Sequence, residues 1–255
     1  MSIDSLKSRI KPLDAEAMRL AQARQNMLTK PAGSLGRLEE LSIQVAGITR
    51  QPNPCLQEKV VAVMAGDHGV VREGVSAYPQ EVTPQMVANF LNGGAAINVL
   101  SRHVGARVVI VDMGVASDMP AHPNLLLKKI AYGTQNICAG PAMTRQQAEQ
   151  AILTGAAVVE AEIARGLDVL ATGDMGIGNT TPSAAIAAVV TGRAACEFVG
   201  RGTGLDDEGL NRKVSAVERA LLVNQPDPAN GIDLLMKVGG FEIGGLAGAI
   251  LAAAA

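Results

Sequence analysis

The sequence predicts an α/β fold with a mostly parallel sheet that helices cover on both faces. Three short apolar runs, residues 60–64, 107–111 and 167–171, have the length of buried strands, and a glycine-containing loop follows each of them. Segments with helical periodicity separate these runs. Strands that alternate with helices are typical of parallel sheets, whose crossover helices lie on the two faces.

The composition is that of a globular protein with an aliphatic core. Of the 255 residues 48% are hydrophobic and 18% charged, but there is no Trp and only two Tyr and three Phe. The net charge of −2, without a basic tract, argues against a nucleic-acid partner. The polar N-terminus does not resemble a signal peptide, and no apolar run is long enough to span a membrane. Cys55, Cys138 and Cys196 lack metal-ligand spacing and predict free thiols in a reducing cytoplasm.

Two helices are expected before the first strand. Asp14 is placed to cap an amphipathic helix over residues 14–28, and the segment 30–36, rich in Gly and Pro, ends it. Ser34 is placed to cap the second helix, which continues to Ile48. We therefore expect a small helical subdomain over residues 1–52 and an α/β domain over 53–255.

The remaining elements follow the same logic. Thr83 and Pro84 predict the start of a helix that Gly93 and Gly94 interrupt and that restarts at Ala95. Residues 120–141 are irregular, with a short strand near 126–130. Further helices are expected over 144–165, from Asp206 onward, over 231–238 and over 243–255.

The segment that follows the third strand indicates an anion-binding loop. Gly173, Gly176 and Gly178 lie between the strand and a helix for which Thr181 is the expected N-cap and Pro182 the first residue. Free N–H groups at a helix start favour a bound anion, and glycines let a ligand approach the backbone closely. Asp174 lies in this loop and offers a group for proton transfer, so the segment predicts a phosphate-bearing ligand with chemistry nearby.

A second glycine loop over 200–204 precedes a helix that carries Lys213. Two backbone-amide loops can hold one phosphate, with Lys213 as a point charge; the alternative is a solvated surface lysine. The segment 74–80 offers Ser76 and Tyr78, and Gln85 follows just inside a helix. Hydrogen-bonding groups and a flat ring suit a planar heteroaromatic ligand, although a loop held by its own polar groups explains the segment equally well.

Acidic residues follow all three expected strands, at Asp67, Asp112 and Asp174. In a parallel sheet they project from one edge, which indicates a site, whereas any one of them alone reads as a turn residue. His68 is a candidate base or ligand. No two histidines have metal-binding spacing, so we expect no metal. Nucleophile-elbow, Walker A and dinucleotide-binding motifs are absent.

Several segments taken together resemble one family, the nicotinate-nucleotide:dimethylbenzimidazole phosphoribosyltransferases (the CobT family). They span nearly the whole chain in the family's order. The segments are Lys30-Pro31-Ala32-Gly33-Ser34-Leu35-Gly36-Arg37-Leu38-Glu39, Ala65 to Val70, Gly74 to Gln85, Asn89 to Asn98, Gly173 to Pro182, Gly202 to Leu205, and Gly239 to Gly245.

The resemblance implies transfer of the phosphoribosyl group of nicotinate mononucleotide to 5,6-dimethylbenzimidazole, giving α-ribazole 5′-phosphate and nicotinate for the lower ligand of cobalamin. It implies a Rossmann-like α/β domain, a homodimer and no cofactor. The benzimidazole would meet Ser76, Tyr78, Gln85 and Met175. The phosphoribosyl group would meet Gly176, Ile177, Gly178, Asn179, Thr180, Thr181, Gly202, Thr203, Gly204 and Lys213, with Asp174 as the catalytic candidate.

The sequence also departs from the family's pattern. Asp174 stands where the family often has Glu, which shortens the reach of the carboxylate by one methylene. The family's general-base Glu and a phosphate-contacting Ser-Gly loop lie beyond the last matching segment, so the resemblance implies a C-terminally truncated member. A binding subunit without catalytic activity therefore stays open as an alternative, as does a nucleotide-dependent oxidoreductase, against which the missing dinucleotide motif counts.

Overall fold

The structure, a computed structural model, describes all 255 residues and contains one sheet of four parallel strands. The strands are β1 (Lys59–Gly66), β2 (Ala106–Gly114), β3 (Leu125–Leu127) and β4 (Val169–Met175). Their order is β3-β2-β1-β4, so that β4 forms one edge. The predicted α/β class with a parallel sheet is confirmed.

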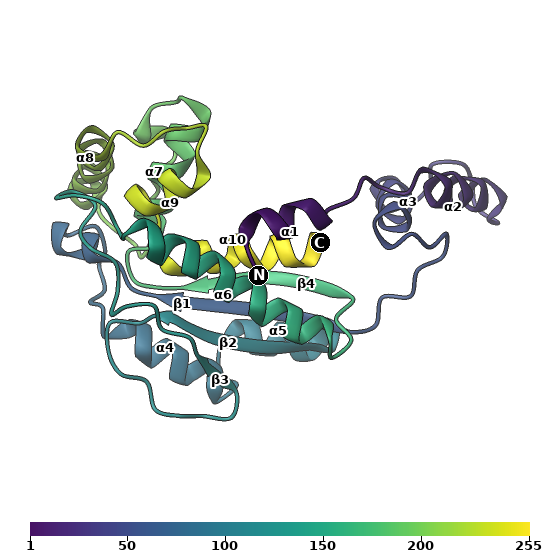
Figure 1. Cartoon of the computed structure of the whole chain (residues 1–255), viewed down its shortest axis with the longest axis horizontal. Helices are drawn as coiled ribbons and strands as arrows, with labels where there is room; N and C mark the ends of the chain where they lie inside the picture. Colours follow the sequence, from purple (N-terminus) through teal and green to yellow (C-terminus); the bar gives the residue numbers. More distant parts are fainter.

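Helices cover both faces of the sheet (Figure 1). On one face lie α6 (Arg145–Ile163) and α10 (Phe241–Ala254), and on the other α4 (Val82–Leu91) and α5 (Ala96–Val104). Buried aliphatic side chains fill both interfaces, with Met64 and Val111 from the sheet and Val159 from α6 among those on the α6–α10 face. Burial of this kind is the main favourable contribution to folding in a chain with so few aromatic residues.

Glycines allow α6 and α10 to approach each other closely. A Cβ atom at Gly155 would lie 1.8 Å from the carbonyl oxygen of Gly245, and one at Gly248 would lie 1.7 Å from that of Ile152. These distances are far inside van der Waals contact, and the obstacle is backbone in both cases. The two helices can therefore pack in this way only because both positions lack side chains.

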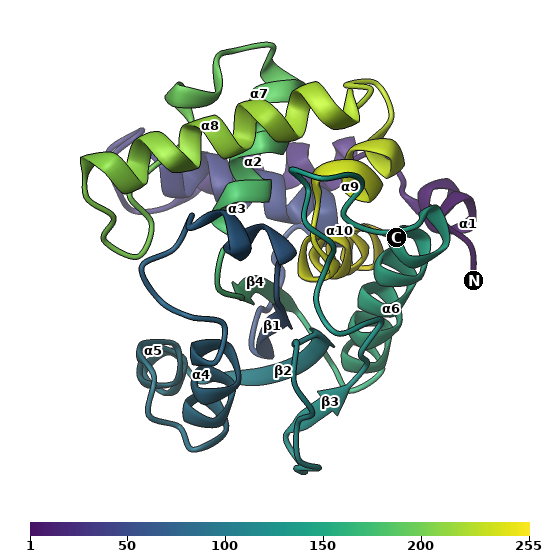
Figure 2. The same ribbon diagram turned by 90° about the vertical axis from the view of Figure 1, so that its left-hand side faces the viewer.

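Three further helices gather at the carboxyl ends of the strands. They are α7 (Thr180–Thr191), α8 (Asp207–Asn224) and α9 (Gly231–Val238), and they share a small core that includes Ala185, Val217 and Val238. Figure 2 shows α8 lying across this end of the molecule. Two 3-10 turns, Gly69–Glu73 after β1 and Ala195–Glu197 after α7, complete it. This end of the fold therefore brings the two predicted glycine loops to the strand exits.

The N-terminal helices divide between two places. The helices α2 (Ala15–Met27) and α3 (Arg37–Thr49) pack on each other and project from the opposite end of the molecule (Figure 1). The helix α1 (Ile3–Arg9) instead lies against α6 and α10. The predicted domain boundary at residue 52 falls in the linker between α3 and β1.

Several predicted element limits were wrong. Strand β4 continues through Asp174 and Met175, which pair with Met64 and Ala65 of β1, so Asp174 is the last residue but one of a strand and does not lie in a loop. Pairing with the neighbouring strand β1 outweighs the tendency of Gly173 to end the strand.

The helix starts also differ from the prediction. Asn179 is the N-cap of α7, which makes Thr181 and Pro182 its second and third residues. Helix α4 begins at Val82 and α10 at Phe241, and α1 was not predicted. A proline is tolerated anywhere in the first turn, because those N–H groups have no partner within the helix, so Pro182 does not fix the first residue.

Candidate functional site

The three acidic residues after the strands reach the same edge of the sheet but differ in what they do. Asp112 accepts a hydrogen bond from the Val115 N–H at 2.9 Å and forms an ion pair with Lys129, also at 2.9 Å. Asp67 accepts hydrogen bonds from the hydroxyl of Thr83 and the N–H of Ala116. Both carboxylates are fully buried and committed to local structure. The three acidic residues share one edge, as predicted, but for Asp67 and Asp112 the alternative of a local structural role holds, and Asp174 is the one that reaches the surface.

The carboxylate of Asp174 accepts a hydrogen bond from the side-chain amide of Asn179. Partial removal of water around Asp174 raises the pKa of its carboxyl above the ordinary value, and the nearby charge of Glu242 adds to the rise. The bond from Asn179 and the proximity of His68 oppose it. Asp174 is thus an exposed carboxyl with a raised pKa at the start of the 176–181 loop.

The 176–181 loop offers several hydrogen-bond donors. The N–H groups of Gly176, Gly178 and Thr180 have no acceptor within the protein. The side chain of Asn179, the N-cap, does not cap the helix, and the buried hydroxyl of Thr181 has no partner. Unpaired donors at a helix start, together with the helix dipole, are the elements of an anion site.

Lys213 connects this loop to the second glycine loop. Its side chain is 1% exposed, and its Nζ donates to the Thr180 hydroxyl at 2.7 Å and to the carbonyl of Gly200 at 3.2 Å. No carboxylate forms an ion pair with it, and burial lowers its pKa. A Cβ at Gly202 would lie 3.1 Å from the Nζ atom.

The arrangement around Lys213 therefore concentrates positive charge. The N–H groups of Gly202 and Thr203, like those of the first loop, have no acceptor within the protein. A buried ammonium group without a counter-charge is unfavourable by itself, because burial removes its hydration. An anion placed between the two loops would supply the missing negative charge and accept hydrogen bonds from the free N–H groups.

The segment 74–80 meets the second glycine loop. The hydroxyls of Ser76 and Thr203 lie 3.3 Å apart, and the N–H of Ala77 donates to Thr203 at 3.0 Å. The Tyr78 N–H donates to Ser76, while the Tyr78 side chain is 53% exposed. Some of these polar groups thus hold the loop, as the alternative interpretation supposed, but the ring of Tyr78 remains free.

Gln85 and Met175 lie farther along the same edge. Gln85 is exposed in the first half of α4, and its side chain makes no hydrogen bond within the protein. Met175, the last residue of β4, is half-buried against the core beneath α4. The structure brings Ser76 and the 200–204 loop into contact, and it leaves Tyr78 and Gln85 available.

His68 and Glu242 form a buried pair that the sequence did not reveal. The Nε2 atom of His68 lies 2.8 Å from Oε1 of Glu242, and the side chains are 1% and 0% exposed. Burial by itself would lower the pKa of His68. Glu242, through its charge and the hydrogen bond, together with Asp67 and Asp174, outweighs burial and raises that pKa above its ordinary value.

The pair lies directly under the loops of the site. A Cβ at Gly240 would come within 2.5 Å of both side chains, and one at Gly176 would lie 3.6 Å from the ring of His68. His68, a candidate base or ligand from the sequence, is thus buried with its Nε2 atom engaged by Glu242, and it belongs to no group of side chains placed to hold a metal ion. Glu242 is 174 residues farther along the chain, and no local pattern links the two.

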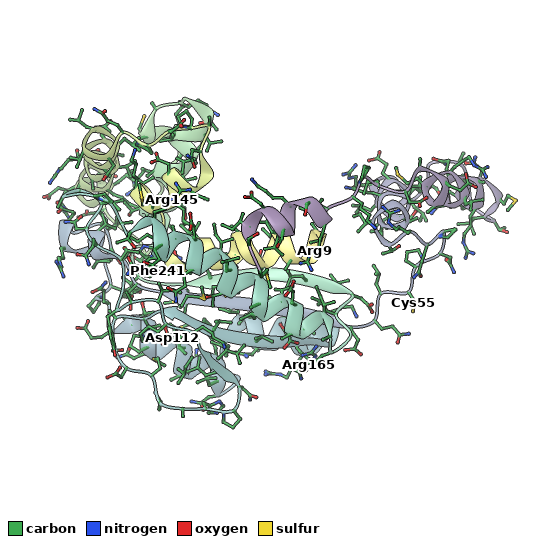
Figure 3. All side chains as sticks on the ribbon, viewed as in Figure 1. Arg9, Cys55, Asp112, Arg145, Arg165 and Phe241 are labelled. Atoms are coloured by element: carbon green, nitrogen blue, oxygen red, sulfur yellow. The ribbon has the colours of Figure 1, made fainter.

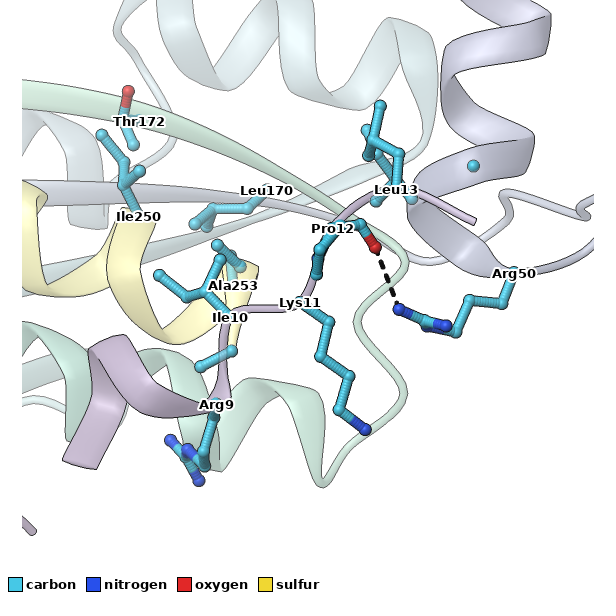
Figure 4. A pocket seen from close by; sticks show the side chains of 14 residues that line it. Arg9, Ile10, Lys11, Pro12, Leu13, Arg50, Leu170, Thr172, Ile250 and Ala253 are labelled. Atoms are coloured by element: carbon cyan, nitrogen blue, oxygen red, sulfur yellow. Dashed lines mark hydrogen bonds between the residues drawn. The ribbon is translucent and has the colours of Figure 1, made fainter. Parts of the chain in front are cut away.

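A large cavity lies away from these residues. It has a volume of about 720 Å³ and is lined by the 9–13 linker, α3, Leu170 and Thr172 of β4, and the last turns of α10 (Figure 4). Arg50 bonds the carbonyl of Pro12 at its rim. In Figure 3 Asp112 and Phe241 lie toward the α7–α8 end, whereas Arg9, which lines the cavity, lies toward the helical hairpin. The cavity is thus separate from the site at the strand ends.

The chain contains neither a metal-binding cluster nor a helix suited to a membrane span. No group of three or more His, Cys, Asp or Glu side chains is placed to hold a metal ion. None of the helices combines the length and the apolar character that crossing a membrane requires.

Comparisons of the sequence and of the structure with known proteins point to the same family. Residues 10–255 match the family model described as Phosphoribosyltransferase. Nicotinate-nucleotide–dimethylbenzimidazole phosphoribosyltransferases from Roseiflexus sp. (strain RS-1) and Desulforudis audaxviator are 60% and 61% identical to this chain, over 97% of its length and 70% of theirs. The crystal structure of CobT from Thermus thermophilus superposes with a TM-score of 0.88 at 47% identity, covering 93% of this chain and 71% of that one.

Proposed function

Because the chain belongs to the nicotinate-nucleotide–dimethylbenzimidazole phosphoribosyltransferase family, we propose that it transfers the phosphoribosyl group of nicotinate mononucleotide to 5,6-dimethylbenzimidazole. The products are α-ribazole 5′-phosphate and nicotinate. The observation that carries this proposal most directly is Lys213, a buried ammonium group without a counter-charge between two loops of free N–H groups.

The phosphate of the mononucleotide fits the space that Lys213 and the loops define. The N–H groups of Gly176, Gly178 and Thr180 belong to the first loop, and those of Gly202 and Thr203 to the second. A phosphate has three terminal oxygens and therefore can accept bonds from both loops and from Lys213. Each of these bonds involves a charged group, for which the net contribution is about 1.5–3 kcal/mol.

The acceptor base would lie on the side of Tyr78 and Gln85. The ring of Tyr78 offers a flat apolar face, and Gln85 offers an uncommitted amide. Met175 ends β4 between this side and the 176–181 loop, with a flexible thioether that packs well on aromatic rings. The contact between Ser76 and Thr203 ties the acceptor segment to the phosphate loop, so the two substrates would meet at one strand edge.

In the reaction, the glycosidic bond to nicotinate breaks while the unprotonated ring nitrogen of the benzimidazole bonds to the anomeric carbon, and the proton on the other ring nitrogen is released to water. Positive charge develops on the ribose, as in glycosyl transfer generally. The carboxylate of Asp174, at the start of the loop, is placed to stabilise that charge when it is ionised. Holding the two reactants together lowers the barrier by about 7–11 kcal/mol in favourable cases.

The proposal is tested by binding and by product formation. Isothermal titration with nicotinate mononucleotide should show one site. Lys213→Met should lower the affinity of that site by roughly 10- to 150-fold, the equivalent of about 1.5–3 kcal/mol. Arg212→Met is the matched control, because Arg212 is exposed and paired with Glu208 on the same helix. Equal affinity in the Lys213 and Arg212 variants would contradict the phosphate assignment.

A second candidate function is a nucleotide-binding subunit without turnover. It is favoured by the observation that His68, Glu242 and Asp67 are sealed inside the protein, which leaves Asp174 as the exposed acidic group among the carboxylates around the 176–181 loop. Mass spectrometry for α-ribazole 5′-phosphate separates the two functions. Binding without product would support the subunit, and product formation would support the transferase.

The proposal includes a homodimer. One face of α5 exposes Val99, Leu100 and Val104, which are 53%, 66% and 54% accessible. Adjacent exposed apolar side chains on one helix are characteristic of interaction surfaces. Light scattering coupled to size exclusion tests it, since a mass near 26 kDa, that of one chain, would exclude the dimer.

A further inference from the structure

Thr83 occupies a central position between the two halves of the site. It lies in the first turn of α4 and is fully buried. Its hydroxyl donates to Oδ1 of Asp67 at 2.6 Å and accepts from the N–H of Ile177 at 3.0 Å. The single hydroxyl proton and the accepting lone pair are both committed, so the direction of each bond is fixed.

Asp67 is held rigidly by its own neighbours. Its Oδ2 accepts from the N–H of Ala116 at 2.8 Å, its N–H donates to Gly114, and its carbonyl accepts from Thr134. The carboxylate therefore accepts from two donors, Thr83 and Ala116. Because Asp67 is fixed in this way at the exits of β1 and β2, it holds the hydroxyl of Thr83 in a defined position.

Ile177 lies in the middle of the 176–181 loop. The other backbone bonds of this loop are internal, from Asn179 to Gly176 and from Thr181 to Gly178. The bond from Ile177 to Thr83 is the hydrogen bond that ties the backbone of residues 176–179 to a different part of the chain. The bond thus holds the peptide of Ile177, between the free N–H groups of Gly176 and Gly178.

We propose that Thr83 is a positioning residue that holds the N–H groups of the 176–181 loop in the orientation required by the phosphate of nicotinate mononucleotide. The inference rests on the proposed function of that loop. The same helix carries Gln85 two residues later, so Thr83 also sets the distance between the loop and the acceptor side. Without the hydroxyl, the loop must become ordered when the ligand binds, and affinity falls.

The test compares Thr83→Val with Thr83→Ser. Valine has nearly the same shape but neither donates nor accepts, and serine keeps the hydroxyl. For Thr83→Val we expect a 5- to 150-fold weaker affinity for nicotinate mononucleotide, roughly the range that loss of a buried hydrogen bond produces. Thr83→Ser should stay within about threefold of the parent chain, since its bonds are retained.

A control with the same substitution lies at the other end of α7. The hydroxyl of Thr191 bonds the carbonyl of Ala187 within its own helix, and Thr191→Val should leave the affinity unchanged. Hydrogen exchange gives the readout that general destabilisation would not produce. In Thr83→Val the amide of Ile177, which loses its acceptor, should exchange about tenfold faster or more, while amides in the centre of β1 keep their protection relative to global stability.

Two outcomes would overturn the inference. One is exchange that accelerates equally across the sheet with unchanged affinity in the folded protein, and the other is a serine variant as impaired as valine. If Thr83→Val does not fold, Asp67→Ala keeps Thr83 but removes the acceptor of its proton, and the same local loosening is expected. If the parent chain does not bind the mononucleotide, the proposed function fails, and the exchange data still decide whether Thr83 orders the loop.

Discussion

The buried pair of His68 and Glu242 provides a sharp test of how this site is stabilised. Two polar side chains with 1% and 0% exposure meet at 2.8 Å beneath the glycine loops. Neither oxygen of Glu242 nor the Nδ1 of His68 has a hydrogen-bond partner elsewhere. Each side chain therefore depends on the other for compensation of its lost hydration.

The perturbation is a double-mutant cycle with His68→Leu, Glu242→Met and the double variant. Removing one partner leaves the other buried without compensation, which costs about 3–5 kcal/mol. Replacing both with apolar side chains of similar volume removes both polar groups, so the double variant should be more stable than either single variant. The coupling free energy should therefore be at least about 3 kcal/mol.

Urea denaturation at about pH 6, followed by circular dichroism, measures these free energies. If the effect of the double variant equals the sum of the single effects, the two groups are independent and the reasoning is wrong. If the parent chain unfolds without cooperativity, urea denaturation has no defined midpoint. The effect of the variants is then measured by hydrogen exchange at the Gly69 amide, next to the pair.

The pH dependence gives a second measurement on the same variants. The pKa of His68 is raised in the folded protein, so the folded state holds a proton that the unfolded chain releases above about pH 6.5. The stabilisation is fully present below that pH and is lost as the pH rises through the folded pKa. The slope is up to about 1.4 kcal/mol per pH unit and should vanish in the double variant.

Three further predictions concern single positions. Lys213→Met should raise the free energy of unfolding by about 1–4 kcal/mol in urea titrations, because it removes a buried uncompensated charge, while it lowers the affinity for the mononucleotide. A destabilised variant would show that the ammonium is already compensated. Gly155→Ala should destabilise by about 1–3 kcal/mol or more, whereas Gly231→Ala, where a Cβ meets nothing within 4 Å, should be neutral or stabilising by about 0.4–1 kcal/mol. Asp174 has a raised pKa, so product formation should increase with pH as its proton leaves, at a higher pH than for an ordinary Asp; Asp174→Asn should lack this acidic limb.

The sequence predicted the features of this fold that depend on local pattern. Strands β1 and β2 and the long helix α6 follow from apolar runs and periodicity, and their existence is confirmed. The end of β4 was missed because pairing with β1 extends it across Gly173. Helix α1 was missed because its start depends on Ser2 and Ser5 capping each other in a short polar segment.

The candidate site was predictable to the extent that its parts lie in glycine loops. The loops around Gly176 and Gly202 could be recognised from composition, and Lys213 from its position in the following helix. Their joining through Thr180 and Gly200 could not, because it depends on how α7 and α8 pack. Thr83 was expected only to begin a helix, and its contact with Ile177 spans 94 positions of the chain.

The buried polar groups of this edge fall into two kinds, and the difference indicates which of them serves a ligand. Asp67 and Asp112 have donors on both oxygens, and the charges of His68 and Glu242 offset each other, although the Nδ1 atom of His68 has no hydrogen-bond partner. Like Asp67, Lys213 has only neutral hydrogen-bond partners, but it lies beside free N–H groups, which add to its positive charge. A protein that keeps an uncompensated charge next to compensated ones forgoes stability there. Under the proposed function, a ligand with negative charge balances Lys213, and the phosphate, more than the base, would determine where the mononucleotide binds.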